Sequence, residues 1–192
     1  FFLIMWQTPK PGSTKLSFYL PLAGSAFKKT YYDELMNRAV SKFVPADDLV
    51  VPYTATSLDD AEAIVHVLKM DENTLRKQQV AGFYRDIDLG TPTDNATTTS
   101  DLKAKERELE GIRKTKQENV FTLLEVHTDL DLEGYEDKDM DGNPTGIKLP
   151  YIVTLEEATR SILSIRRNYE IGDPNKSRIK YFTHFKFLPG LG

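Results

Sequence analysis

The stretch that decides the fold is Leu20–Tyr53, LPLAGSAFKKTYYDELMNRAVSKFVPADDLVVPY. Its alternating apolar residues and turn residues predict three short strands, over 26–32, 39–43 and 49–51. Turn signals recur roughly every eight to twelve residues, which is typical of an antiparallel meander. We expect the preceding segment, 15–22, to be a half-buried strand, because Leu16, Phe18 and Leu20 alternate with polar or small neighbours.

Composition limits the class of protein. The chain has 192 residues, of which 40% are hydrophobic and 28% charged, as expected for one core-forming domain. Its net charge of -4 disfavours nucleic-acid binding through a strongly basic surface. The absence of cysteine excludes disulfides, thiolate nucleophiles and Cys-ligated metals. The opening FFLIMW is too short for a membrane span, and we expect the chain to be part of a longer one.

The rest of the chain adds further strands and two helices. Apolar and β-branched residues predict strands over 64–70, 120–126 and 179–187. Asp71 is a good N-cap for a helix through Ala81, with Gly82 just past its end and Leu75 and Val80 as its apolar anchors. A strongly charged helix is expected over 101–118, with the thin apolar stripe Leu102, Leu109 and Ile112.

One segment supports two interpretations. Thr154–Glu157 matches a capping box, and apolar residues then recur at helical spacing, which slightly favours an amphipathic helix. The residues with that spacing are Leu155, Ala158, Ile162, Ile165 and Tyr169. The competing interpretation is a hairpin in which 151–155 pairs with 162–167.

The sharpest candidate for a metal site is the acidic loop 137–143, DKDMDGN. Asp137, Asp139 and Asp141 match the alternating ligands that open a calcium loop, and Gly142 suits its sharp turn. The match then fails, because Lys148 stands where a bidentate Glu closes such a site. We therefore expect an exposed Asp-Gly turn, with calcium binding as a minority hypothesis.

No catalytic constellation or cofactor motif is recognisable. The histidines His66, His127 and His184 lie in separate strand-like runs, and we expect strand residues rather than metal ligands. His127, Asp129 and Asp131 alternate on one strand face, so a metal or acid–base cluster remains the alternative. The nucleophile elbow, the phosphate-binding loop and the dinucleotide fingerprint are all missing.

A family resemblance emerges from the order of several short segments. Together they resemble the portal proteins, or head-to-tail connectors, of short-tailed bacteriophages. The matching segments are Gly24–Lys29, Tyr31–Asp33, Phe43–Asp47, Val50–Tyr53, Leu75–Lys77, Gly82–Arg85, Leu124–His127, Gly146–Tyr151, Arg166–Asn168 and Tyr181–Lys186. The resemblance covers about residues 15–192 and lies in the succession of the pieces. Residues 1–14 are an unplaced N-terminal segment.

The resemblance implies a structural subunit rather than an enzyme. Portal proteins form a ring, usually a dodecamer, at one vertex of the virion capsid, and they assemble in the cytoplasm of the bacterial host. Double-stranded DNA passes through the channel without sequence recognition during packaging and ejection. The implied partners are other copies of the chain, the terminase, capsid and scaffolding proteins, and a tail adaptor; no membrane and no cofactor is implied.

The resemblance also carries local expectations. Residues 15–192 look like the α+β wing that spreads outward from the channel, and the stem, clip and C-terminal parts are not recognisable. Family members have a hairpin at the position of 151–167, so we expect the hairpin there against the local periodicity. Lys28, Lys29, Asp33 and Asp47 are then candidates for polar sheet-edge or intersubunit contacts. The alternatives are a metal- or calcium-binding module or enzyme built on 129–141, and another virion adaptor protein.

Overall fold

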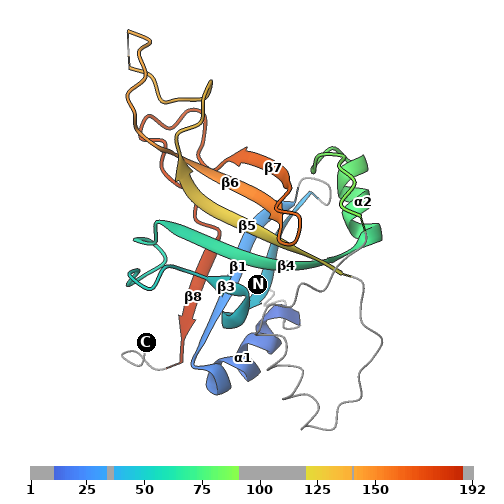
Figure 1. Cartoon of the computed structure of the whole chain (residues 1–192). Helices are drawn as coiled ribbons and strands as arrows, with labels where there is room; N and C mark the ends of the chain where they lie inside the picture. Colours follow the sequence, from blue (N-terminus) through green and yellow to red (C-terminus); the bar gives the residue numbers. More distant parts are fainter. Residues whose placement is uncertain (1–10, 34–36, 91–119, 140, 188–192) are drawn as a thin grey trace, which may run out of the picture.

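The computed structural model of the protein describes residues 11–33, 37–90, 120–139 and 141–187. Two antiparallel sheets dominate the fold, and a few short helices accompany them (Figure 1). The smaller sheet has the strand order β2-β1-β8 and the larger sheet the order β3-β4-β5-β6-β7. This arrangement confirms the predicted α+β class with antiparallel hairpins.

The smaller sheet joins the two ends of the described chain. β1 (Ser25–Asp33) pairs on one side with β2 (Arg38–Pro45) and on the other with β8 (Phe182–Lys186). The short helix η1 (Ala46–Asp48) then leads into β3 (Leu49–Val50), which pairs with the larger sheet instead. The three strands predicted from the sequence are therefore confirmed, but they do not form one continuous meander, because the third strand belongs to the larger sheet.

The strand predicted for 15–22 is wrong. These residues belong to α1 (Pro11–Ala23), whose start at a proline suits the first position of a helix. Gly24, at φ +71°, ends the helix and donates its backbone N–H to Leu20 O at 2.9 Å. Tyr19 packs edge-to-face on Phe43 of β2, with the ring centroids 5.3 Å apart. The apolar residues of this short segment fit both the strand period of two and the helical period of 3.6. Packing of the segment on the smaller sheet decides for the helix.

The larger sheet is built from long neighbouring strands. β4 (Ala63–Asp71) pairs with β5 (Val120–Leu130), which pairs with β6 (Leu149–Glu156), and β6 forms a hairpin with the edge strand β7 (Ile162–Arg167). The hairpin predicted over 151–167 is confirmed, in the expected register and with a bulge near Leu155. Strand pairing with β5 outweighs the helical spacing of the segment, since a helix there leaves one side of β5 unpaired.

Helix α2 (Glu72–Val80) begins as predicted, because the Asp71 carboxylate accepts the backbone N–H of Thr74 at 2.9 Å. Leu75 is a buried anchor, but Val80 is exposed and the prediction for it is wrong. Gln79 takes the buried position instead and donates its side-chain amide to the carbonyls of Arg85 and Ile87. The helix predicted for 101–118 lies outside the described residues. Among the helices that the structure describes, none is long and apolar enough to cross a membrane.

The core lies on one face of the larger sheet, which we call its inner face; α2 and residues 84–89 cover one part of this face and the smaller sheet covers the other. One apolar cluster gathers around Leu123 and Leu163, and a second gathers around Phe27 and Ile64. A polar row crosses the sheet between the two clusters, formed by residues in direct register on four strands. These residues are His66, Glu125, Thr154 and Ser164, and all four are buried.

Candidate functional site

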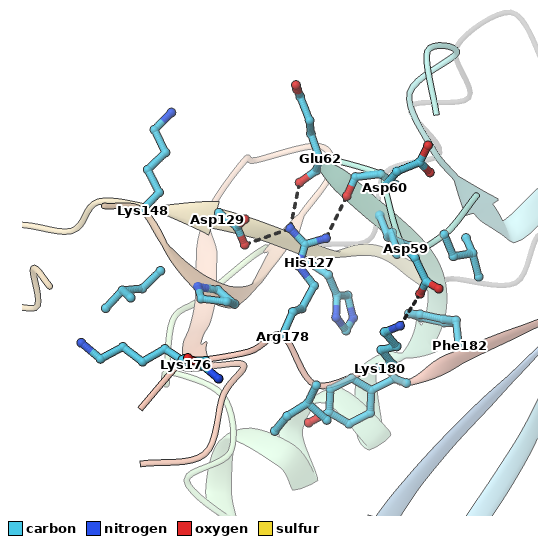
Figure 2. A pocket seen from close by; sticks show the side chains of 18 of the residues that line it. Asp59, Asp60, Glu62, His127, Asp129, Lys148, Lys176, Arg178, Lys180 and Phe182 are labelled. Carbon is cyan, nitrogen blue, oxygen red and sulfur yellow. Dashed lines mark hydrogen bonds and ion pairs between the residues drawn. The ribbon is translucent and has the colours of Figure 1, made fainter. Parts of the chain in front are cut away.

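A cavity of about 580 Å³ opens beside the ends of β5 and β6 (Figure 2). Residues 174–182, just before and at the start of β8, form one side of it, and residues 58–64 form another. Apolar side chains such as Leu58, Ile179 and Phe182 share the lining with five carboxylates and four cationic groups. The cavity is thus a mixed surface with nearly balanced charge.

Arg178 joins three segments at the rim of this cavity (Figure 2). Its guanidinium donates to Ala61 O at 2.8 Å and to Glu62 O at 3.3 Å, and it reaches Asp129 Oδ1 at 2.9 Å. Two further ion pairs flank it: Lys180 lies 2.7 Å from Asp59, and Lys176 pairs with Asp137. Three of the four cations are therefore neutralised within the chain, and they connect residues 174–182 to residues 59–62, to β5 and to the acidic loop.

His127 lines the cavity from the inner face and belongs to a buried ionic cluster. Its Nε2 lies 2.7 Å from Glu125 Oε1, and Lys29 Nζ from the smaller sheet lies 2.5 Å from the same oxygen. The rings of Tyr181 and Phe182 pack edge-on against the imidazole, at centroid distances of 5.6 and 5.2 Å. These contacts fix the His127 ring between the two sheets.

Burial and charge shift the pKa values of this cluster. Burial opposes the charge of Glu125, but the hydrogen bond from His127 and the ammonium of Lys29 prevail and lower its pKa to about 2. Burial lowers the pKa of Lys29, although the neighbouring Glu125 carboxylate opposes that shift. Burial, with the Lys29 charge nearby, lowers the pKa of His66 to about 4. At neutral pH the cluster therefore contains an ionised Glu125 and an uncharged His66.

The acidic loop forms the expected Asp-Gly turn. Asp139 accepts the backbone N–H groups of Asp141 at 3.0 Å and Asn143 at 2.8 Å, and Gly142 has φ +85°. The Asp137 carboxylate accepts from Thr145 Oγ1 at 2.6 Å and pairs with Lys176. Two of the three candidate calcium ligands are thus engaged by donors of the chain itself.

The cluster proposed as a metal or acid–base site is only partly assembled. His127 and Asp129 both line the cavity, but Asp131 is exposed and does not. Asp129 is held by Arg178, and His127 faces Glu125. Across the described ranges no group of three or more His, Asp and Glu side chains is placed to hold a metal ion.

The intersubunit candidates occupy different environments. The side chain of Lys29 is nearly buried, since its ammonium pairs with Glu125 inside the molecule. Lys28 lies beside it on β1 with its ammonium 5.8 Å from the centre of the Phe185 ring, and Asp33 ends the same strand. Asp47 is exposed in η1.

All three histidines lie in strands, as predicted. His184 is exposed on β8, where its ring stacks on Phe27 at 4.6 Å and its Nε2 lies 2.6 Å from Ser25 Oγ. Sequence reasoning missed Glu125 and Arg178. Glu125 carried a signal, because it alternates with Leu123 and His127 along β5; Arg178 carried none, since its partners are distant backbone carbonyls.

No family model matches the chain, and no curated protein matches its sequence significantly.

Proposed function

We propose that this chain is the wing-like part of a bacteriophage portal subunit, a structural protein of the ring at the capsid vertex. The observation that carries the proposal is the β6–β7 hairpin. Local periodicity favours a helix at 154–169, whereas the resemblance to portal proteins predicts strands there. The paired strands, from Tyr151↔Arg167 to Leu155↔Ile162, agree with the resemblance and so support it.

The chemistry of the cavity suits a structural role. Its cations Lys176, Arg178 and Lys180 each pair with a carboxylate of the same chain. Ion pairs of this kind join segments that are distant in the sequence, and these three leave little cationic charge for a substrate. The charged groups of the cavity therefore serve mainly to hold residues 174–182 in place.

The overall charge fits the proposed passage of DNA. A chain with net charge -4 repels phosphate, so double-stranded DNA moves past without adhering. We propose as partners other copies of the subunit, the terminase, capsid and scaffolding proteins, and a tail adaptor. The proposed place of function is the virion, after assembly in the host cytoplasm.

Electron microscopy of the full-length subunit tests this proposal. We expect negatively stained particles to be closed rings with a central channel, and light scattering to give one mass that is a multiple of the subunit mass. Monomers or open assemblies across the micromolar range would contradict a portal role. A ring that binds neither terminase nor prohead but does bind a finished portal would favour the virion adaptor instead.

A further inference from the structure

The larger sheet has a second face, which points away from the smaller sheet and which we call the outer face. On this face, residues in direct register on neighbouring strands form rows that run across the sheet. Two adjacent rows contain only aliphatic side chains, with one side chain from each strand in the row. The first row is Val50, Val65, Val126, Val153 and Ile165, and the second is Val67, Leu124, Leu155 and Ile162. A solvated face of an antiparallel sheet normally alternates to polar residues at these positions.

Side chains of the outer face are much less buried than their neighbours on the inner face. Along β5, the inner residues Leu123, Glu125 and His127 are 0%, 6% and 2% exposed, whereas Leu124 and Val126 between them are only half-buried. At the margins the exposure is larger still: 52% for Val50, 40% for Ile162 and 46% for Ile165. β5 lies between β4 and β6. The partial burial of its outer residues therefore comes from side chains of these neighbouring strands.

Every described element that packs on the larger sheet packs on its inner face. Helix α2 contributes Leu75 to the apolar cluster with Leu123, and β1 contributes Phe27 to the cluster with Ile64. Tyr135 and Tyr169 reach the outer face only at its end, where they contact Tyr151. Within the described residues, therefore, nothing covers the two aliphatic rows.

The size of this surface suits the centre of a protein interface. Five strands at about 4.8 Å spacing and two rows about 7 Å apart define roughly 300 Å² of continuous aliphatic surface. Patches of this size on single chains are commonly binding sites. A standard interface buries about 800 Å² on each partner, with an apolar centre and a polar rim.

The rim of the patch carries charges of both signs. Lys69 and Glu157 lie in the row beyond Leu124, on either side of Thr122, and Arg167 lies in the row beyond Val126. All three charged residues are exposed. A mixed rim suits another protein surface of mixed charge, and it does not suit a nucleic acid or an anionic membrane.

We propose that a neighbouring copy of this chain covers the outer face. The inference rests on the proposed function, because a ring consists of copies that each bury one surface against the next. A ring closes through heterologous contacts, so the outer face of one copy meets a different surface of its neighbour. The nine aliphatic residues form the centre of that contact, and Lys69, Glu157 and Arg167 form part of its rim.

Cross-linking in the full-length subunit tests this directly. The chain described here has no cysteine, so Leu124→Cys, in a full-length subunit whose remaining cysteines are replaced, carries a benzophenone label at one defined site. Rings are assembled from an equal mixture of ¹⁴N and ¹⁵N subunits and irradiated. We expect cross-linked peptide pairs of mixed isotope composition, which arise only between copies. Uniform pairs without any mixed pairs, including pairs to residues 91–119, would show that the same chain covers the face and would overturn the inference.

A pair of charge variants supplies the second measurement. Leu124→Asp places a charge at the centre of the patch, and Ser41→Asp places the same charge on an exposed position of β2. Circular dichroism first shows that both variants are folded. We expect Leu124→Asp to raise the concentration for half-assembly by about tenfold or more, with no change for Ser41→Asp. Rings that tolerate Leu124→Asp overturn only this inference, whereas an unmodified subunit without rings overturns the proposed function as well.

Discussion

Lys29 Nζ lies 2.5 Å from Glu125 Oε1, and this contact joins the central strand of the smaller sheet to the central strand of the larger one. The two residues are 96 positions apart in the chain. Both side chains are nearly buried, so neither charge is compensated by water. The pair therefore fixes how the two sheets face each other.

Removal of the ammonium should cost considerable stability. Lys29→Met leaves the Glu125 carboxylate buried with His127 as its remaining partner, and we expect a loss of about 3 kcal/mol in the free energy of unfolding. Urea denaturation at pH 7.5 measures it. The matched control is Lys28→Met on the same strand, which removes a cation–π contact with Phe185 of roughly 1 kcal/mol or less. Equal losses for the two variants would show that the buried pair contributes nothing specific.

Stability should fall as the pH is lowered below neutrality. His66 has a folded pKa of about 4, below its unfolded value of 6.5, so the folded state favours its neutral form. This contribution is complete above pH 6.5 and is lost as the pH falls from 6.5 to about 4. Glu125 has a folded pKa of about 2 against 4.5 unfolded, so its contribution is lost between pH 4.5 and 2. Each loss is about 3 kcal/mol by linkage.

The contribution of His66 can be measured from urea denaturation midpoints at pH 7.5, 5.5 and 4.0, with His184 as the comparison. We expect His66→Gln to remove most of the decline between pH 6.5 and 4, because the titrating group is gone. His184→Gln is the control, since His184 is an exposed residue of β8 and its titration affects folding less. An unchanged pH profile for His66→Gln would contradict the assignment.

Arg178 should stabilise the segment before β8. Arg178→Met removes donors to Ala61 O, Glu62 O and Asp129, and we expect a loss of about 2 kcal/mol in the free energy of unfolding. Hydrogen exchange of residues 174–181 should accelerate with it, as measured by mass spectrometry. Lys180→Met breaks only an exposed ion pair with Asp59 and should cost under about 1 kcal/mol. Unaltered exchange in the Arg178 variant would rule out this anchoring role.

The acidic loop should not bind calcium. The Asp137 carboxylate is paired with Lys176, and Asp139 accepts backbone N–H groups, so a cation has to displace these donors. We expect isothermal titration with Ca²⁺, Mg²⁺ and Mn²⁺ to give no binding heat in the micromolar range. Lys176→Met provides an internal check, because it frees Asp137 and should raise any weak affinity. Micromolar binding by the unmodified chain would favour the calcium-module hypothesis.

Much of the fold was predictable because strands and caps are local features. Alternation, turn residues and β-branched content located β1, β2, β4 and β5, and the Asp71 cap with Gly82 located α2. Periodicity failed where a short segment fits two periods at once. Residues 15–22 suit a strand or a helix, and only packing on β2 makes them helical. Residues 151–167 suit both as well, and the partner strand β5 decides for a hairpin.

The strands β1, β2 and β3 and the α+β class follow from local sequence features, because side-chain alternation and turn residues act over a few positions. The tertiary structure alone decided that β3 leaves the first sheet and that Lys29 meets Glu125. It also decided which face of the larger sheet stays uncovered within the described residues. The physical reason is the separation of these residues along the chain. Each contact joins two segments that are far apart in the sequence, and the residues around one segment do not indicate which other segment it will meet.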